Sequence, residues 1–249
     1  MAGCWWLVAG CWLLVASGWL LVIIIYLLLI THYFLLFTRY SLLATPYSLF
    51  PTQLMWQYKT PGIPDNLFAR LPGIPLSKRE VRILLISSLR MKPDSILWDI
   101  GAGTGTIPVE VGLLCPEATI VAVERDEEVA GLIRKNCDRF EVKNVEVIEG
   151  NAPDCFSDLA AKPDRICLEG GKPIGNILKE AWEYLQPEGR IVSTASNLEN
   201  LYTLSKGLAD LQARNIEVVQ SAVNRLETRG INQTFAAVNP IFILSGEKF

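Results

Sequence analysis

The chain has 249 residues and a formal net charge of −3, and its mean hydropathy of +0.28 is high for a soluble protein. The acidic balance, without any long basic run, argues against a general nucleic-acid binder. The single histidine, His32, rules out histidine catalysis and histidine-ligated metal sites, so we expect no metal. The scattered cysteines contain no Cys-x-x-Cys pair, which favours reduced thiols over a disulfide framework.

Residues 1–45 form an apolar segment in which no Asp, Glu, Lys or Arg precedes Arg39. About 20 apolar residues cross a bilayer as a helix, so residues 5–37 are predicted to form a transmembrane helix. The positive-inside rule, applied to Arg39 and Lys59, then places the remaining chain in the cytoplasm, as a catalytic domain anchored to the membrane. The alternative is a misassigned start, because Met55 stands just before the globular part and would remove the anchor.

Residues 46–76 form a proline-rich stretch with few periodic apolar positions, which predicts an extended arm rather than a helix. The folded domain is expected to cover residues 77–249. Ser77 and Glu80 have the spacing of a capping box, which predicts that a helix starts there and continues to Arg90. Its predicted buried positions are Val81, Leu84, Leu85 and Ser88.

A strand, a glycine turn and the start of a helix are predicted between Ser95 and Leu114. Alternating glycines let the backbone lie against a ligand where a Cβ atom would collide. Thr106 stands where the dinucleotide fingerprint has Gly or Ala, so that motif does not match. The pattern acidic-x-Gly-x-Gly-x-Gly instead resembles the nucleoside loop of class I S-adenosylmethionine methyltransferases, which implies S-adenosyl-L-methionine as the cofactor; a tight turn without a ligand is the alternative. The predicted cofactor contacts here are Asp99, Gly101, Ala102, Gly103, Thr104 and Gly105.

The apolar run 118–124 predicts a buried second strand that ends in Glu124. This acid lies about 20 residues beyond the glycines, where nucleoside-binding folds place the carboxylate that accepts the ribose hydroxyls. Asp126 is the competing candidate. After a helix over 127–140 and a strand over 145–148, Asn151 and Ala152 occupy the turn that commonly frames the adenine in methyltransferase folds.

The remaining elements are predicted in regular α/β order. Strand 164–168 is followed by the turn Glu169-Gly-Gly-Lys-Pro173, which lacks the Pro-Pro-aromatic element typical of base and amide methylation. An antiparallel pair over 215–221 and 235–244 is expected to complete a seven-stranded sheet. The other predicted elements are a helix over 174–185, a strand over 189–195 and a helix over 197–213.

Several short motifs together resemble the decarboxylating precorrin methyltransferase family, over roughly residues 60–246. They are the arm 62–68, the helix start 77–82, the turn 150–153, the Gly170-Gly171 turn, and the pairs Arg229-Gly230 and Asn239-Pro240. The resemblance is to the C15-methylating half of the family, in cobalamin biosynthesis. It implies a Rossmann-like class I methyltransferase sheet with helices on both faces, here preceded by the apolar N-terminal helix. It also implies methylation of a corrin precursor with loss of an acetate carboxyl as CO2.

The same resemblance assigns cofactor contacts to Ser77, the glycine loop, Glu124 and Ala152. It further implies a homo-oligomer and a separate C5-methyltransferase subunit. A carboxylate-rich tetrapyrrole needs cationic partners, for which bidentate arginines are well suited. The predicted substrate contacts are Arg79, Arg82, Gly170, Gly171, Lys172, Arg225 and Arg229.

The sequence does not identify a catalytic residue, and solvated surface positions are the alternative for each of the cations. Two other functions stay open. One is methylation of another small molecule, a tRNA or a protein on the same fold. The other is a non-catalytic, membrane-tethered cofactor-binding subunit.

Overall fold

The computed structural model describes residues 29–32 and 56–249. The chain divides into two compact units, Met1–Gln53 and Leu54–Phe249. Residues 29–32 of the first unit are helical. Within the described ranges, no helix is both long and apolar enough to cross a membrane. Nearly all of the predicted span 5–37, and the first part of the predicted arm, lie outside the described residues.

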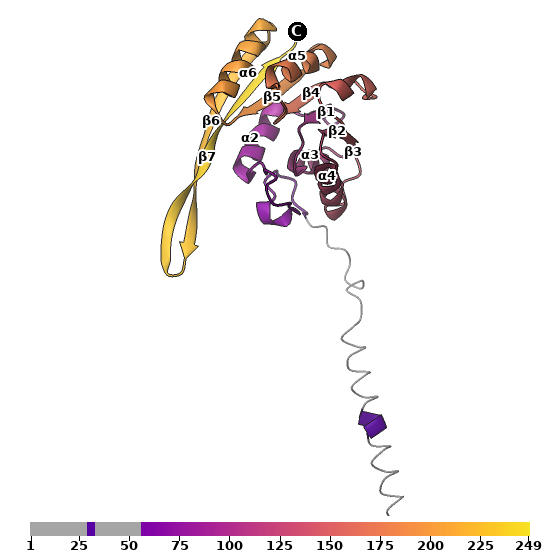
Figure 1. The fold of residues 1–249 in the computed structure, drawn as a ribbon, viewed down its shortest axis with the longest axis vertical. Coiled ribbons are helices and arrows are strands. Elements are labelled where there is room, and N and C mark those ends of the chain that lie inside the picture. The colour runs from indigo at the N-terminus through magenta and orange to yellow at the C-terminus, as the bar shows by residue number, and fades with distance from the viewer. Residues whose placement is uncertain (1–28, 33–55) are drawn as a thin grey trace, which may run out of the picture. The chain divides into compact units, whose positions relative to one another are not determined.

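The second unit is built on a seven-stranded sheet with the order β3-β2-β1-β4-β5-β7-β6 (Figure 1). The first five strands are parallel, and β7 runs antiparallel to both β5 and β6. This architecture confirms the predicted seven-stranded α/β fold. The strands are β1 (Ile96–Ile100), β2 (Thr119–Glu124), β3 (Val145–Glu149), β4 (Arg165–Leu168), β5 (Arg190–Ala195), β6 (Arg214–Arg229) and β7 (Asn232–Glu247).

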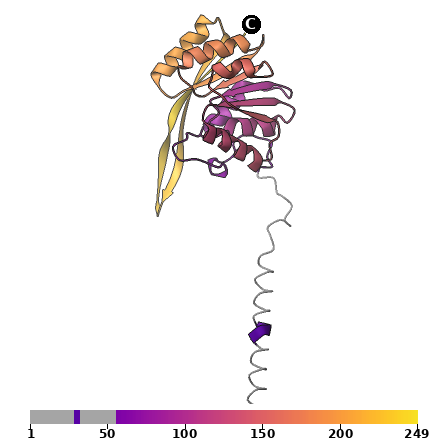
Figure 2. The same cartoon turned by 45° about the vertical axis from the view of Figure 1, so that its right-hand side comes forward.

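Helices cover both faces of the sheet, as predicted (Figure 2). Trp98 and Ile100 of β1 face a core that includes Ile177 and Leu204 from the helices of one layer. Leu97 of β1 instead faces the helices of the other layer. The first layer holds α5 (Ile174–Tyr184) and α6 (Leu198–Asp210), and the second holds α2 (Arg79–Leu89), α3 (Thr106–Leu114) and α4 (Glu127–Arg139).

The start of α2 differs from the prediction. The helix begins at Arg79, and no side chain caps it from Lys78. Asp65, in a short 3-10 turn at Asp65–Leu67, accepts the hydrogen bond of the Arg79 amide at 3.0 Å. The predicted capping box is therefore wrong, because the hydroxyl of Ser77 is bonded elsewhere. The buried face is also shifted, and consists of Val81, Arg82, Leu85, Ile86 and Leu89 rather than including Leu84 and Ser88.

The β6–β7 hairpin is longer than predicted. Each strand has 16 residues, and the part beyond Val223 pairs only within the hairpin. This part projects past the body of the unit (Figure 1). A register shift between Ser221 and Val223 marks the place where the hairpin leaves the sheet. The prediction ended the strand at 221 because the projecting half buries no regular apolar face.

Candidate functional site

The glycine turns after β1 and β4 pack against each other. A Cβ atom at Gly101, where φ is +76°, would lie 3.0 Å from the backbone N and Cα of Gly170. The amides of Gly101 and Ala102 donate to the Val123 carbonyl at 3.0 and 3.1 Å, which ties the loop to β2. Only glycine combines this conformation with so close an approach. The loop therefore lies at the carboxyl edge of the sheet, where β1 is flanked by β2 and β4.

Glu124 at the end of β2 lies directly against the glycine loop. Its carboxylate accepts hydrogen bonds from the amides of Gly103, Arg125 and Asp126 at 3.1, 3.0 and 3.2 Å. The competing acid, Asp126, has a different role, because it accepts from the amide of Val129 and so caps α4. The geometry thus favours Glu124 over Asp126 as the acid that faces a ligand in this loop.

The turn after β3 lies next to this acid. The Gly150 amide donates to the Glu124 carbonyl at 2.9 Å, so the predicted adenine turn is tied to the end of β2. Within that turn, the amide group of Asn151 donates to Asp154 at 2.8 Å and is exposed. Ala152 is half-buried. The turn is near the loop, but Asn151 is held by a neighbour on its own turn.

Asp99 carries a buried carboxyl group whose oxygens lack hydrogen-bond partners among the described residues. It is 1 % exposed, and neither oxygen has a hydrogen-bond partner in the described part of the chain. Cys167, its register neighbour on β4, offers only a weak thiol donor. Burial raises the pKa of Asp99 well above its ordinary range, and the negative charges of Glu169 and Glu124 act in the same direction. A cationic ligand nearby would stabilise the ionised form of this carboxyl.

Glu169 is a site residue that the sequence did not single out. It follows β4, is half-buried, and accepts a hydrogen bond from the Ser77 hydroxyl at 2.6 Å. Burial raises the pKa of the Glu169 carboxyl, while the Ser77 hydrogen bond and the positive charge of Arg82 oppose the rise. The available signal was position, since an acid at the end of β4 must lie beside the glycine loop at the end of β1.

The end of the arm crosses the same edge of the sheet. The Thr104 hydroxyl donates to the Pro75 carbonyl at 2.9 Å, and Ser77 reaches Glu169 two residues later. These bonds join the arm to the loop after β1 and to the turn after β4. Ser77, predicted as a cofactor contact from the family resemblance, is therefore brought next to the glycine loop.

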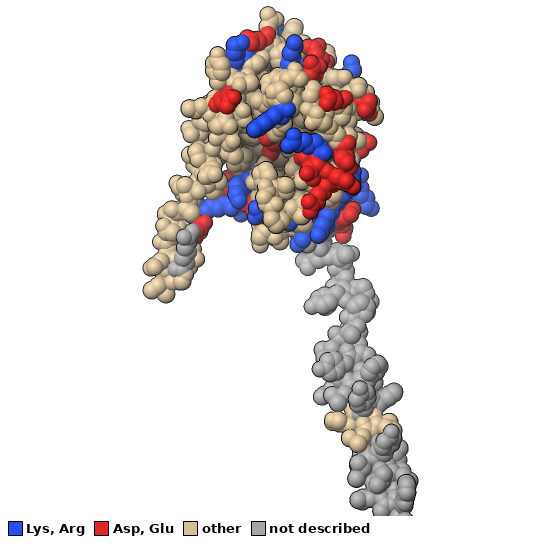
Figure 3. All heavy atoms as spheres, viewed as in Figure 1, with Lys and Arg blue, Asp and Glu red and all other residues tan. Residues whose placement is uncertain are grey.

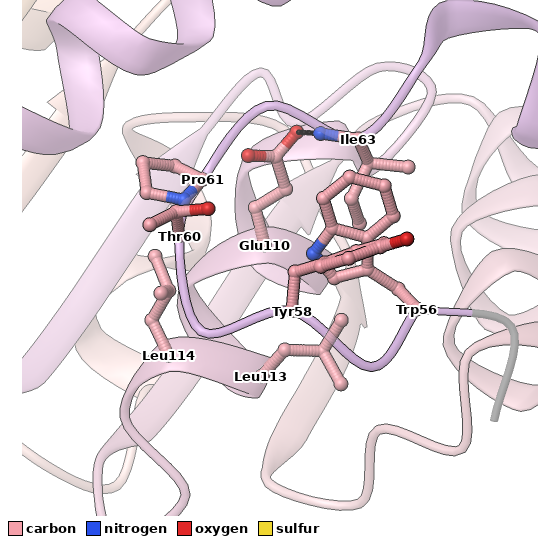
Figure 4. Close-up of a pocket in the computed structure, with 8 residues that line it drawn as sticks. All are labelled: Trp56, Tyr58, Thr60, Pro61, Ile63, Glu110, Leu113 and Leu114. Atoms are coloured by element: carbon pink, nitrogen blue, oxygen red, sulfur yellow. Dashed lines mark hydrogen bonds between the residues drawn. The ribbon is translucent and has the colours of Figure 1, made fainter.

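Arg82 is fully buried and paired within the protein, so no face of it is open to a substrate in this structure, and its contact with the substrate stays a prediction. Its guanidinium group is fully buried and lies 2.7 Å from Glu110 and 2.8 Å from Asp65. Glu110 also accepts from the amides of Gly62 and Ile63 at 2.7 and 3.1 Å (Figure 4). These bonds fasten the arm onto α2 and α3.

The shallow crevice in Figure 4 is lined by Trp56, Tyr58, Thr60, Pro61, Ile63, Glu110, Leu113 and Leu114.

The other predicted cations lie in different settings. Arg225, on the hairpin, pairs with Asp65 at 3.0 Å and also with Glu80. Arg79 is partly exposed and pairs with Glu80 at 3.2 Å. Lys172 is exposed in the turn after β4. The side chain of Arg229 is outside the described part of the structure, so its prediction stays open.

Comparison with known proteins gives a consistent result. A sequence profile described as a precorrin methyltransferase domain matches residues 72–248. A probable cobalt-precorrin-6B C(15)-methyltransferase (decarboxylating) of Saccharolobus solfataricus is 37 % identical over 196 residues, which are 78 % of this chain and 98 % of the relative. The Salmonella typhimurium cobalt-precorrin-6B C(15)-methyltransferase (decarboxylating) is 32 % identical over 185 residues, 74 % of this chain and 95 % of the relative.

A solved structure shows the same fold. The precorrin-6y C5,15-methyltransferase of Geobacter metallireducens superimposes with a TM-score of 0.72 and 33 % identity. The match covers 77 % of this chain and 100 % of that structure. The region matched by the family profile, residues 72–248, lies within the second unit and contains the glycine loop and the two flanking turns.

Proposed function

The chain belongs to the precorrin methyltransferase family, and on that basis we propose that it methylates C15 of a corrin precursor and removes a carboxyl group as CO2. The methyl donor is S-adenosyl-L-methionine. The names of the relatives support both halves of this reaction. The observation that carries the proposal is the convergence of the glycine loop, Glu124 and the uncompensated Asp99 at one sheet edge.

The residues present fit this methyl donor. Gly103 would bring a Cβ atom no closer than 3.7 Å to any neighbour, so the loop keeps an open backbone face for a ligand. Glu124 supplies the acceptor for ribose hydroxyls. The buried charge of Asp99 favours the cationic sulfonium and ammonium groups of the donor. We therefore assign the cofactor to Ser77, Asp99, Gly101, Ala102, Gly103, Thr104, Gly105, Glu124, Asn151 and Ala152.

The cofactor, when bound, supplies an electrophilic methyl group on a sulfonium that departs neutral. The displacement needs little acid chemistry, so the protein contributes alignment of the two reactants, an effect worth several kcal/mol of barrier. The loop fixes one reactant at the ends of β1 and β2. The acceptor then approaches from the side of β4, where the Gly170-Gly171 turn and Lys172 lie.

The corrin precursor carries carboxylates that need cations on this side. Lys172 is the exposed candidate at the β4 turn, and Arg79 lies on the first turn of α2. Arg225 is a candidate that must exchange its present partners, Asp65 and Glu80, for the substrate. Arg229, on the same hairpin, completes the proposed set.

Turnover with a late corrin precursor tests the function. The full chain is incubated with S-adenosyl-L-methionine and the precursor, and the products are identified by mass spectrometry. We expect the product to gain one methyl group and lose CO2. Cofactor binding without any change in the tetrapyrrole would overturn the substrate assignment and leave the fold assignment intact.

The projecting hairpin supports self-association. It exposes Ile231, Phe235 and Leu226 to 99, 73 and 53 %, and few charges lie on its visible face (Figure 3). Such apolar exposure is typical of an interaction surface, and we assign it to a homo-oligomer. Light scattering should show a smaller particle for the double variant Ile231→Ser/Phe235→Ser than for Tyr202→Ser on α6, a position that is 69 % exposed.

Two further assignments complete the proposal. We also propose that a separate chain carries out methylation at C5, because the curated relatives, matched over 98 and 95 % of their length, are named for C(15) methylation. The catalytic unit works in the cytoplasm, and residues 5–37 anchor it to the membrane when they are translated. Fractionation of cells expressing the full chain, followed by peptide mapping before Met55, tests the anchor. Peptides confined to residues after Met55 would contradict it.

A further inference from the structure

Glu169 lies where a methyl acceptor has to bind. Ligands of open α/β sheets occupy the crevice outside the carboxyl ends of the strands, at the point where the strand order reverses. Here β1 is flanked by β2 on one side and β4 on the other. Glu169 follows β4 directly, and its neighbour Gly170 packs against Gly101 of the loop. The side chain of Glu169 is therefore adjacent to both halves of the proposed site.

Three carboxyl groups lie at this edge, and they differ in exposure, in hydrogen-bond partners and in the ease with which they hold a proton. Glu124 accepts hydrogen bonds from three amides, so it serves as an acceptor. Asp99 is 1 % exposed and is assigned to the cofactor, so we do not assign it to the acceptor. Glu169 is half-buried and has the Ser77 hydroxyl as its hydrogen-bond partner. Of the three, only Glu169 belongs to a half-buried residue whose surroundings favour the protonated form of its carboxyl.

The charges around Glu169 come from several elements. Asp99 on β1 is close enough for the charge of Glu169 to make ionisation of Asp99 harder. Cys167 on β4 is buried beside them, with its thiol pKa raised well above the ordinary value. Arg82 on α2 and Ser77 on the arm act in the opposite direction. The balance raises the pKa of Glu169, mainly through burial, so the carboxyl keeps its proton at a higher pH than usual.

We propose that Glu169 is the acid that protonates the side-chain carbon from which CO2 has left. This inference rests on the proposed function. In the step, the bond between the methylene carbon and the carboxylate breaks, CO2 departs, and the electron pair stays on the methylene carbon and the conjugated ring. As CO2 departs, the carbon forms a bond to the proton of Glu169, which becomes a carboxylate; without this proton, CO2 returns to the carbon and the carboxyl is retained. Water restores that proton between turnovers.

The variant Glu169→Gln tests this role because it keeps the shape and a hydrogen-bond partner for Ser77 but carries no acidic proton. S-adenosylhomocysteine and CO2 are measured in the same reaction, so methyl transfer and decarboxylation are read separately. Loss of a general acid typically costs about 10²–10⁴-fold in the step that it serves. We expect CO2 formation to fall by that factor, methyl transfer to fall less than about tenfold, and a methylated product that retains its carboxyl to accumulate.

Cofactor affinity shows that the variant is folded, and Glu183→Gln on the exposed side of α5 is the matched control. Glu169→Asp, which keeps an acidic proton, should restore part of the CO2 formation. In the wild-type protein, CO2 formation should decline as the pH rises through the raised pKa of Glu169, and this decline should disappear in Glu169→Gln.

An equal loss of both products in Glu169→Gln would overturn the inference, because it would show that Glu169 positions the acceptor. Unchanged production of both would overturn it as well. Failure of the wild-type protein to convert any corrin precursor, with cofactor bound, would instead refute the proposed function and this inference with it. If the wild-type protein converts the precursor but Glu169→Gln changes methyl transfer and CO2 formation equally, only the role of Glu169 is refuted.

Discussion

Arg82 and Glu110 form an ion pair in the interior of the unit, with 2.7 Å between Nε and Oε1 and side-chain exposures of 0 and 1 %. Removing one partner of such a pair leaves a buried charge uncompensated, which costs about 3–5 kcal/mol. We expect Arg82→Ala to lower the free energy of unfolding in denaturant by that amount. The control Arg79→Ala, on the same helix but 46 % exposed, should change stability by less than about 0.5 kcal/mol. Equal effects of the two variants would contradict this account of the arm.

The close contact between the glycine turns makes Gly101 intolerant of a side chain. A Cβ atom there would meet backbone atoms of Gly170 at 3.0 Å, in a left-handed conformation with φ +76°. Gly101→Ala should therefore lose about 1–3 kcal/mol of stability, together with cofactor binding measured by calorimetry. Gly131, within α4, has nothing within 4 Å of its virtual Cβ atom. Gly131→Ala should stabilise the protein by about 0.5–1 kcal/mol and leave binding unchanged.

Glu124 and Asp126 are separated by one residue but are expected to respond differently. Glu124→Ala removes the acceptor assigned to the ribose, and hydrogen bonds to a charged group are worth about 1.5–3 kcal/mol. The dissociation constant for S-adenosylhomocysteine should rise about tenfold to a hundredfold. Asp126→Ala removes only the cap of α4, at a cost of about 1 kcal/mol in stability. A larger rise in the dissociation constant for Asp126→Ala would reverse the assignment of the ribose acid.

Asp99 should reduce the stability of the free protein while aiding cofactor binding. Its folded-state pKa lies above the ordinary value of 3.8, so the folded state holds this proton more tightly than the unfolded chain. The stabilisation from that proton is present below pH 3.8 and is lost as the pH rises through the raised pKa. At neutral pH, Asp99→Asn should therefore unfold at a higher denaturant concentration than the wild type. Its affinity for S-adenosyl-L-methionine should fall, and a variant that gains both stability and affinity would refute the assigned role.

The glycine loop, the acid at the end of the second strand and the positions of the strands along the chain were predictable because local patterns encode them. Continuous apolar runs mark the buried parallel strands, and glycines mark the turn where side chains do not fit. These signals lie within windows of about 20 residues, so no long-range contact is needed to read them.

The misread residues depend on partners that are distant in the sequence. Ser77 bonds to Glu169, 92 positions away, so the local capping-box pattern was misleading. Arg82 is buried because Glu110, 28 positions away, neutralises it, and the only local hint is an acid within the apolar segment of α3. Glu169 was missed because its importance comes from the packing of the β4 turn against the β1 turn.

Asp65 bonds to Arg82 on α2 and to Arg225 on the hairpin, 160 positions further along the chain. During synthesis from the N-terminus, the arm can lie on α2 and α3 long before residue 225 has left the ribosome. The contacts of Asp65 with Arg225 then form only when the hairpin has emerged. The arm of a nascent chain is thus fastened in two stages, and its final position awaits a hairpin residue that lies 160 positions after Asp65.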